Sequence, residues 1–166
     1  MTKPSFQKLW SEFPDHVKYK NMKDLYTGLG GAAEKNINLP GFGPNGNTCA
    51  SRMSMAFNKA GAPIKKISGI QTLSTADGSL IIFRVANFRT YLRSSLGSPT
   101  KDDISPYDDT FKGRKGIIAF TVNWQGATGH IALWNGITYR EPSYDNYSTY
   151  VNGSSKTSLG EFWEIA

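Results

Sequence analysis

Apolar residues recur at helical spacing near the start of the chain. Ser5 can cap a first helix that ends at Pro14. The apolar face of this helix comprises Phe6, Leu9, Trp10 and Phe13. A second short helix is predicted over residues 22–27, because the Gly-Leu-Gly-Gly sequence at 28–31 stops it.

The longest helical stripe begins at the single cysteine of the chain. A polar, glycine-rich loop over residues 35–48 leads to it. Apolar residues then follow at i, i+4, i+7, i+8 and i+11, and they are Cys49, Met53, Ala56, Phe57 and Ala60. This spacing predicts a helix with one buried face, which Gly61 closes and Pro63 cannot continue.

The rest of the chain reads mainly as strands. Residues 79–85 read as a buried strand, and 87–97 as a helix that Asn87 caps and Gly97 ends. A polar loop is predicted over 98–109. Further strands are predicted over residues 116–124, 129–134, 137–141 and 161–165. The predicted fold class is therefore α+β, with N-terminal helices that carry the cysteine packed on a C-terminal antiparallel sheet.

Asn135-Gly136 is the strongest hairpin signal in the chain, and it suggests a catalytic pairing. If these are the two turn residues, Trp134 pairs with Ile137, and His130 faces Glu141 across the ladder. Directly opposed side chains on one face lie close enough for an imidazole and a carboxylate to hydrogen-bond. Glu141 would then orient His130, as the carboxylate of a catalytic triad orients its base.

Cys49 would supply the nucleophile of such a site. A thiol in the first turn of a helix lies at the positive end of the helix dipole, which favours the thiolate, and a nearby imidazolium favours it further. The backbone N–H of Cys49 would also point to the place where an acyl oxyanion develops, with Asn47 as the candidate for a second donor.

Each of these residues also has an ordinary structural interpretation. A lone cysteine on an apolar helix face is usually a core residue, His130 can be a structural histidine, and Glu141 can be a solvated charge. The combination of the three is what favours catalysis. His16 has no identifiable partner and receives no role. Two histidines and one cysteine argue against a metal site, and no phosphate-binding loop is present, so no cofactor is expected.

Composition narrows the class of protein. A length of 166 residues suits one domain spanning 1–166, and 39% hydrophobic residues indicate a globular fold. The net charge of +6 suits an anionic partner such as bacterial cell wall, or only a basic soluble surface. The basic residues are too scattered for nucleic acid, and no apolar run could span a membrane. The start of the chain lacks a Sec-type signal, so work outside the cytoplasm would need another export machine.

Two motifs around the candidate residues resemble a known family. Asn-Thr-Cys-Ala-Ser-Arg-Met-Ser at 47–54 and Gly-His-Ile-Ala-Leu-Trp-Asn-Gly at 129–136 resemble the type VI secretion amidase effectors, fourth family. The stretches PSFQKLW (4–10), GRKGIIAF (113–120) and FWEI (162–165) extend the resemblance over nearly the whole chain. The resemblance implies a papain-like fold of the cell-wall hydrolase type.

In this family Cys49 and His130 match the catalytic pair. The third residue is typically an Asp soon after the tryptophan-bearing strand, where the hairpin count places Glu141; Asp145 is the alternative if the loop differs in length. Many relatives carry a disulfide in this loop, which this chain, with one cysteine, lacks.

The resemblance also implies a function. The chain would be a toxin that the type VI secretion apparatus delivers into the periplasm of rival Gram-negative cells, where it would cut the γ-D-glutamyl–meso-diaminopimelate bond of peptidoglycan stem peptides. A cognate periplasmic immunity protein would block its cleft. Two other classes remain open: a non-catalytic wall- or polyanion-binding module, and an acyltransferase or transglutaminase that uses the same Cys–His pair.

Overall fold

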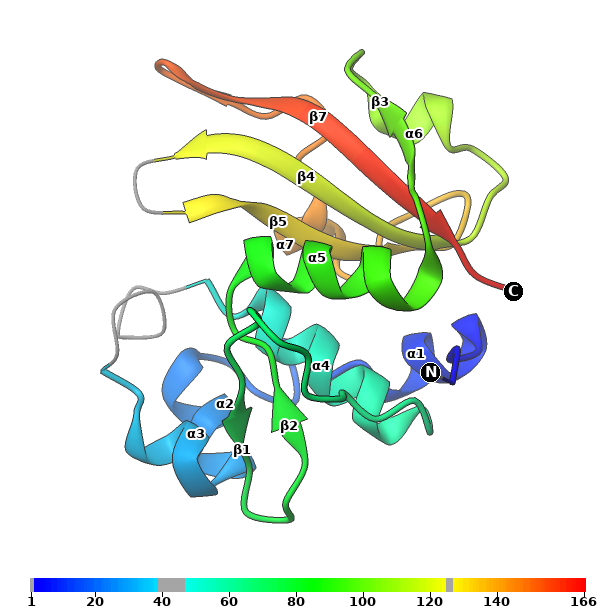
Figure 1. Cartoon of the computed structure of the whole chain (residues 1–166). Coiled ribbons are helices and arrows are strands. Elements are labelled where there is room, and N and C mark those ends of the chain that lie inside the picture. The colour runs from blue at the N-terminus through cyan, green and yellow to red at the C-terminus, as the bar shows by residue number, and fades with distance from the viewer. Residues whose placement is uncertain (1, 39–46, 125–126) are drawn as a thin grey trace.

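The structure, a computed structural model, describes residues 2–38, 47–124 and 127–166 (Figure 1). The helices are α1 (Phe6–Glu12), α2 (Met22–Leu29), α3 (Gly31–Lys35), α4 (Cys49–Lys59), α5 (Val85–Leu96), α6 (Tyr107–Thr110) and α7 (Pro142–Asp145). The strands are β1 (Leu73–Ser74), β2 (Leu80–Ile81), β3 (Thr100–Asp102), β4 (Gly116–Trp124), β5 (Ala127–Trp134), β6 (Val151–Asn152) and β7 (Ser155–Glu164). Most of the long loop predicted before Cys49 falls in 39–46, outside the described residues.

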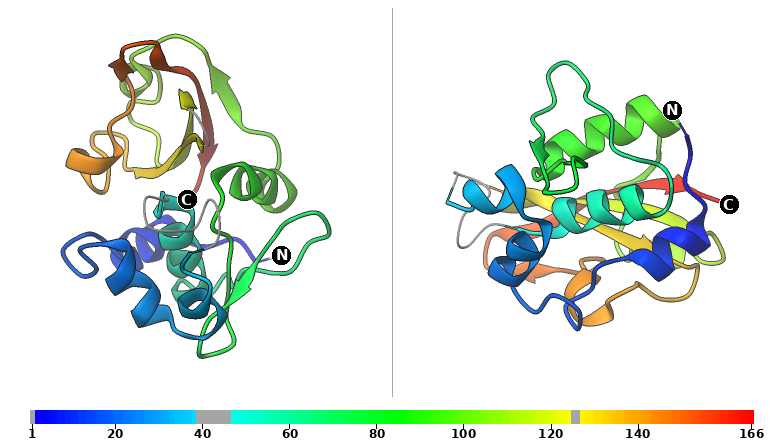
Figure 2. Two further views of the ribbon diagram at one scale, coloured as in Figure 1. Left: turned by 90° about the vertical axis from the view of Figure 1, so that its left-hand side faces the viewer. Right: turned by 90° about the horizontal axis from the view of Figure 1, so that it is seen from below.

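An antiparallel sheet forms one side of the molecule. Within the described residues its strand order is β3-β7-β4-β5, and β6 pairs with the first residues of β7. Strands β1 and β2 pair separately. In Figure 1 the sheet lies above α5, and α4 runs below α5 with α1, α2 and α3 beside it. The left view of Figure 2 shows the same division from the side, with the sheet above and the N-terminal helices below it. The α+β class and the helix-then-sheet order are confirmed.

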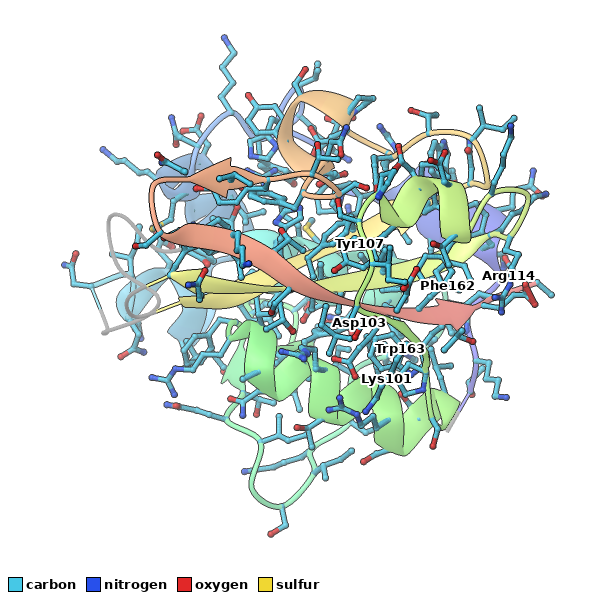
Figure 3. All side chains as sticks on the ribbon, turned by 90° about the horizontal axis from the view of Figure 1, so that it is seen from above. Lys101, Asp103, Tyr107, Arg114, Phe162 and Trp163 are labelled. Atoms are coloured by element: carbon cyan, nitrogen blue, oxygen red, sulfur yellow. The ribbon has the colours of Figure 1, made fainter. Side chains whose placement is uncertain are left out.

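The central strand β4 is apolar along most of its length because both faces of the sheet are covered. Ile117 and Ala119 belong to the core shared with α4 and α5. Ile118 and Phe120, which alternate with them, pack on the opposite face with Tyr107 and Phe162. Figure 3 labels Tyr107 and Phe162, at the face that α6 covers. A strand buried on both faces reads as a continuous hydrophobic run, which explains why the prediction for 116–124 is confirmed.

Helix α4 is enclosed on almost every side. Its residues from Cys49 through Phe57 are all buried, because α1, α5, β2 and β5 pack around it. The predicted stripe of Met53, Ala56 and Phe57 lies in the main core, as expected. Because the other faces of α4 are also buried, polar residues such as Ser51 and Arg52 lie in the interior. The helix is therefore held firmly, and its first residue has a fixed position beside β5.

The predicted pairing of residues 129–134 with 137–141 is wrong. The structure has no strand over 137–141; Trp134 forms an isolated bridge with Tyr139 rather than with Ile137. Asn135 makes a wider turn, since its side-chain oxygen accepts hydrogen bonds from the N–H groups of both Ile137 and Thr138. The chain then turns into α7, and the ladder partner of β5 is β4, with His130 opposite Phe120.

Other boundaries also differ from the prediction. The strand expected over 79–85 is reduced to β2, and α5 begins at Val85, so Asn87 lies inside the helix and does not cap it. The stretch predicted as a polar loop over 98–109 contains β3 and the start of α6. The helix predicted to stop at 28–31 is followed at once by α3. Within the described residues, no helix is long and apolar enough to cross a membrane.

Candidate active site

Cys49 is the first residue of α4, and its side chain is almost fully buried. Its side chain lines the same pocket as the imidazole of His130, close enough for the cysteine to raise the pKa of that ring. Helix α4 and strand β5 pack against each other, which explains how two residues far apart in the sequence meet. The structure therefore brings the two predicted site residues together.

His130 reaches the helix from the edge strand of the sheet. Gly129 precedes it with φ +149°, and an added Cβ there would lie 1.7 Å from the carbonyl oxygen of Phe120. Only glycine therefore allows the two backbones to approach this closely next to the histidine. Nε2 of His130 lies 2.8 Å from Oδ1 of Asp145. Because Nε2 faces Asp145, Nδ1 is the ring nitrogen left for the sulfur of Cys49.

The carboxylate against His130 is that of Asp145, not that of Glu141. Asp145 is the last residue of α7, and only 2% of its surface is exposed. Its second oxygen, Oδ2, accepts a hydrogen bond of 2.9 Å from the backbone N–H of Glu141. The hairpin count failed because the wider turn at Asn135 and the short helix α7 change which residue points to His130.

Glu141 instead binds His16, the histidine for which the sequence offered no partner. Nδ1 of His16 lies 2.9 Å from Oε1 of Glu141, and the backbone N–H of His16 donates to Oε2 at 2.9 Å. The ring of Tyr144 stacks on the His16 ring at a centroid distance of 3.6 Å. These partners are 125 residues apart in the sequence, and no local pattern connects them.

The charges of the site stabilise the protonated form of His130. Burial lowers the pKa of His130, but the negative charge of Cys49 and the hydrogen bonds to Asp145 and Cys49 raise it, so that it reaches about 10. A histidine placed between a cysteine side chain and a carboxylate is the arrangement of groups that a Cys–His nucleophile requires. The centroid of the Tyr147 ring lies 4.9 Å from that of the His130 ring.

The two groups expected to bind an oxyanion are both engaged in this structure. The backbone N–H of Cys49 donates to Oδ1 of Asn47 at 3.0 Å. The side-chain amide of Asn47 donates to the carbonyl oxygen of Gly129 at 2.9 Å. Asn47 thus joins the first residue of α4 to β5, and the Cys49 N–H is not an open donor here.

These residues line one pocket with a volume of about 140 Å³. Cys49, His130 and Asp145 lie on its wall, together with His16, Glu141 and Tyr144. Across residues 2–38, 47–124 and 127–166, no three His, Cys, Asp or Glu side chains are grouped to hold a metal ion. Sequence analysis did not identify His16, Tyr144 or Tyr147 as site residues, because their contacts with Glu141, with each other and with His130 join segments that are distant in the sequence.

The comparisons with known proteins agree on one family. The model of type VI secretion system (T6SS) amidase effector protein 4, Tae4, matches residues 45–163. In a crystal structure of the Tae4 effector from Salmonella typhimurium with the immunity protein Tai4 from Enterobacter cloacae, the matched chain is 31% identical. The match has a TM-score of 0.83 and covers 99% of this chain and 100% of that chain.

Two further structures give similar values. The Tae4-Tai4 complex from Enterobacter cloacae matches at 31% identity and a TM-score of 0.83, covering 99% of this chain and 100% of that one. The Tae4 effector from Enterobacter cloacae matches at 31% identity and a TM-score of 0.81, covering 99% of this chain and 98% of that one. A search of curated protein sequences gave no match. The resemblance seen in the two motifs is confirmed, and the chain belongs to the type VI secretion system amidase effector protein 4 family.

Proposed function

We propose that this chain is a peptidoglycan amidase in which Cys49 is the nucleophile, His130 the general acid and base, and Asp145 the residue that orients His130. The observation that carries the proposal is the grouping of Cys49, His130 and Asp145 in one pocket, with Nε2 of His130 2.8 Å from Oδ1 of Asp145. Membership of an amidase effector family supports hydrolysis of an amide bond. Within this family the substrate would be the γ-D-glutamyl–meso-diaminopimelate bond of wall stem peptides.

Acylation would begin with the Cys49 thiolate. The sulfur attacks the amide carbon, a C–S bond forms, and the carbonyl oxygen becomes an oxyanion. The imidazolium of His130 then gives its proton to the leaving nitrogen, and the C–N bond breaks. Asp145 keeps the ring in one orientation throughout, because its Oδ1 accepts the hydrogen bond from Nε2.

Deacylation reverses the role of His130. The neutral ring takes a proton from water, and the resulting hydroxide attacks the thioester carbon, releasing the acid and restoring the thiolate–imidazolium pair. For the Cys49 N–H to stabilise either oxyanion, the substrate oxygen has to replace Oδ1 of Asn47. Asn47 is therefore proposed to hold the helix start until substrate binds, rather than to donate to the oxyanion.

The proposed setting follows the family. As a type VI effector the chain would be delivered into a rival Gram-negative cell and act on the wall in its periplasm. Two of the matched structures are complexes of Tae4 with the immunity protein Tai4. We propose that this chain has a corresponding periplasmic immunity partner that covers the pocket at Cys49.

The test of the proposal is digestion of purified peptidoglycan, followed by mass spectrometry of the muropeptides. Wild-type protein should release fragments cut between D-glutamate and diaminopimelate, and Cys49→Ala should release none while retaining the wild-type circular dichroism spectrum. A fully active Cys49→Ala variant would contradict the proposal.

The same assay separates the other two classes. A non-catalytic binding module would bind sacculi but release no new muropeptides. Its buried Cys49 would also resist iodoacetamide at pH 6. An acyltransferase would transfer the acyl group to an added amine, which the mass of the product reveals.

A further inference from the structure

The N-terminal segment 14–19 connects the two halves of the active site. It lies between α1 and α2 in the sequence, and the carbonyl oxygens of its two end residues bind a residue of α4. Nη1 of Arg52 donates to the Pro14 oxygen at 2.8 Å, and Nη2 donates to the Tyr19 oxygen at 2.9 Å. One arginine of the nucleophile helix thus holds both ends of the segment.

Arg52 also reaches back to the start of its own helix. Its Nε donates to Oγ1 of Thr48 at 2.9 Å, and Thr48 immediately precedes the nucleophile. Only 1% of the surface of Arg52 is exposed, so these hydrogen bonds are made in the protein interior, where an unpaired cation would be costly. The position of segment 14–19 is therefore fixed relative to Cys49.

The middle of the same segment binds the turn that carries Asp145. His16 uses both its backbone N–H and its Nδ1 on the carboxylate of Glu141. Asp15 accepts a hydrogen bond of 3.1 Å from Arg140, which adds a second contact to the same turn. The stack of Tyr144 on the His16 ring limits rotation of the imidazole.

Glu141 connects these contacts to the triad through its backbone. Its N–H donates to Oδ2 of Asp145, and its carbonyl oxygen accepts the N–H of Asp145 at 2.9 Å. The other carboxylate oxygen of Asp145 is the one on His130. A rotation of the Glu141 peptide would therefore turn the Asp145 carboxylate away from the imidazole.

We propose that His16 and Glu141 are positioning residues of the active site, and that segment 14–19 sets the orientation of Asp145 toward His130 through their hydrogen bonds. Neither residue needs to touch the reacting atoms. Their effect on catalysis is exerted through Asp145, while the hydrogen bonds of Arg52 fix the position of the same segment relative to Cys49. The kinetic part of this inference rests on the proposed amidase function.

The direct test is His16→Ala, followed by steady-state kinetics on a soluble stem peptide. We expect kcat to fall about tenfold or more with KM nearly unchanged, since a misplacement of about 1 Å in a catalytic group can cost about 100-fold. His16→Asn should recover much of the loss, because its amide can donate to Glu141 in place of Nδ1. The matched control is Val17→Ala, which changes the neighbouring side chain, 88% exposed, and should leave kcat unchanged.

A second readout needs no substrate. The chain has two histidines, so in His16→Ala the NMR titration of the remaining ring belongs to His130 alone. The groups that face His130 are Cys49 from α4 and Asp145 from α7, with the Tyr147 ring beside them. Weakening the Asp145 hydrogen bond should lower the pKa of His130 relative to wild type, in the same direction as Asp145→Asn.

The outcomes separate this inference from the proposed function. An unchanged kcat and an unchanged His130 titration in His16→Ala would overturn the inference, and so would a rise in KM alone, which would indicate a substrate contact instead. If His16→Ala does not fold, kcat and KM of Glu141→Gln are measured in its place, and an unchanged kcat overturns the inference. A wild-type protein without amidase activity would contradict the proposed function. A lower pKa of His130 in the variant than in the wild type would still support the positioning role.

Discussion

Asp145 and Glu141 are neighbouring carboxylates with different surroundings and different expected roles. One oxygen of Asp145 contacts His130, and the other is bound by the Glu141 backbone. The Glu141 carboxylate faces away from His130, toward His16. Cys49 and His130 could be identified from the sequence because each has a local signal, a helix start and a strand start. The third residue could not, because its identity depends on the path of the chain after the strand.

Asp145→Asn should reduce kcat by a factor on the order of 10²–10⁴, because an amide no longer holds the protonated ring in place. The carboxylate raises the pKa of His130, so its removal lowers that pKa, and the protonated ring is lost at a lower pH. The alkaline limb of the kcat profile should therefore move to lower pH, which a pH series on a soluble stem peptide measures.

Glu141→Gln provides the comparison for Asp145→Asn. We expect a smaller loss of kcat than for Asp145→Asn, since the Gln backbone N–H still donates to Oδ2 of Asp145. A larger loss in Glu141→Gln than in Asp145→Asn would show that Glu141, not Asp145, is the orienting residue.

At the scale of elements, the Asn135-Gly136 signal was correct about the turn but not about its length. Gly136 accepts a hydrogen bond of 2.8 Å from the N–H of Gly113, in the loop before β4. That contact, with the Asn135 side chain on two successive N–H groups, favours the wider turn. A tertiary contact of this kind is absent from the local sequence pattern. By contrast, α4 was predicted well because its buried stripe has helical spacing, and β4 because a strand covered on both faces is a continuous hydrophobic run.

Strand β5 depends on glycine next to His130, the proposed catalytic base. Gly129→Ala should destabilise the protein by about 2–4 kcal/mol, because the new Cβ would overlap the Phe120 carbonyl and push the strands apart. The same displacement moves His130, so activity should fall more than stability alone explains. Urea unfolding and kinetics at a temperature where the variant is folded measure the two effects.

Gly78→Ala is the matched control for this substitution. Gly78 also has a positive φ, +85°, but nothing lies within 4 Å of an added Cβ. The free energy of unfolding should fall by only about 1–2 kcal/mol, because alanine disfavours the left-handed backbone conformation, and kcat should not change. Equal costs for the two variants would contradict the close approach at Gly129.

At the scale of the whole molecule, the net charge of +6 predicts how the protein responds to salt. Raising the ionic strength from about 0.01 M to about 0.15 M shortens the Debye length from about 30 Å to about 8 Å and weakens attraction to an anionic polymer. Hydrolysis of intact sacculi should therefore slow several-fold, while hydrolysis of a short soluble stem peptide changes little. An equal response of both substrates would show that surface charge does not recruit the wall.

The site as a whole is assembled from segments that are distant in the sequence. The Asn47–Gly129 and His16–Glu141 hydrogen bonds join residues 82 and 125 positions apart. The sequence could therefore indicate which residues are chemically suitable, and the fold decides which of them meet.

Cys49 is the only cysteine of the chain, and this has a consequence for its lifetime in an oxidising compartment. Peroxide converts a thiolate to sulfenic acid, which a neighbouring thiol in the same protein can trap as a disulfide. This chain has no second thiol for that purpose, so recovery requires a small thiol or a reductase from outside. Further oxidation to sulfinic acid is irreversible. With Cys49 as the proposed nucleophile, oxidation of one sulfur atom would end the activity of a molecule that remains fully folded.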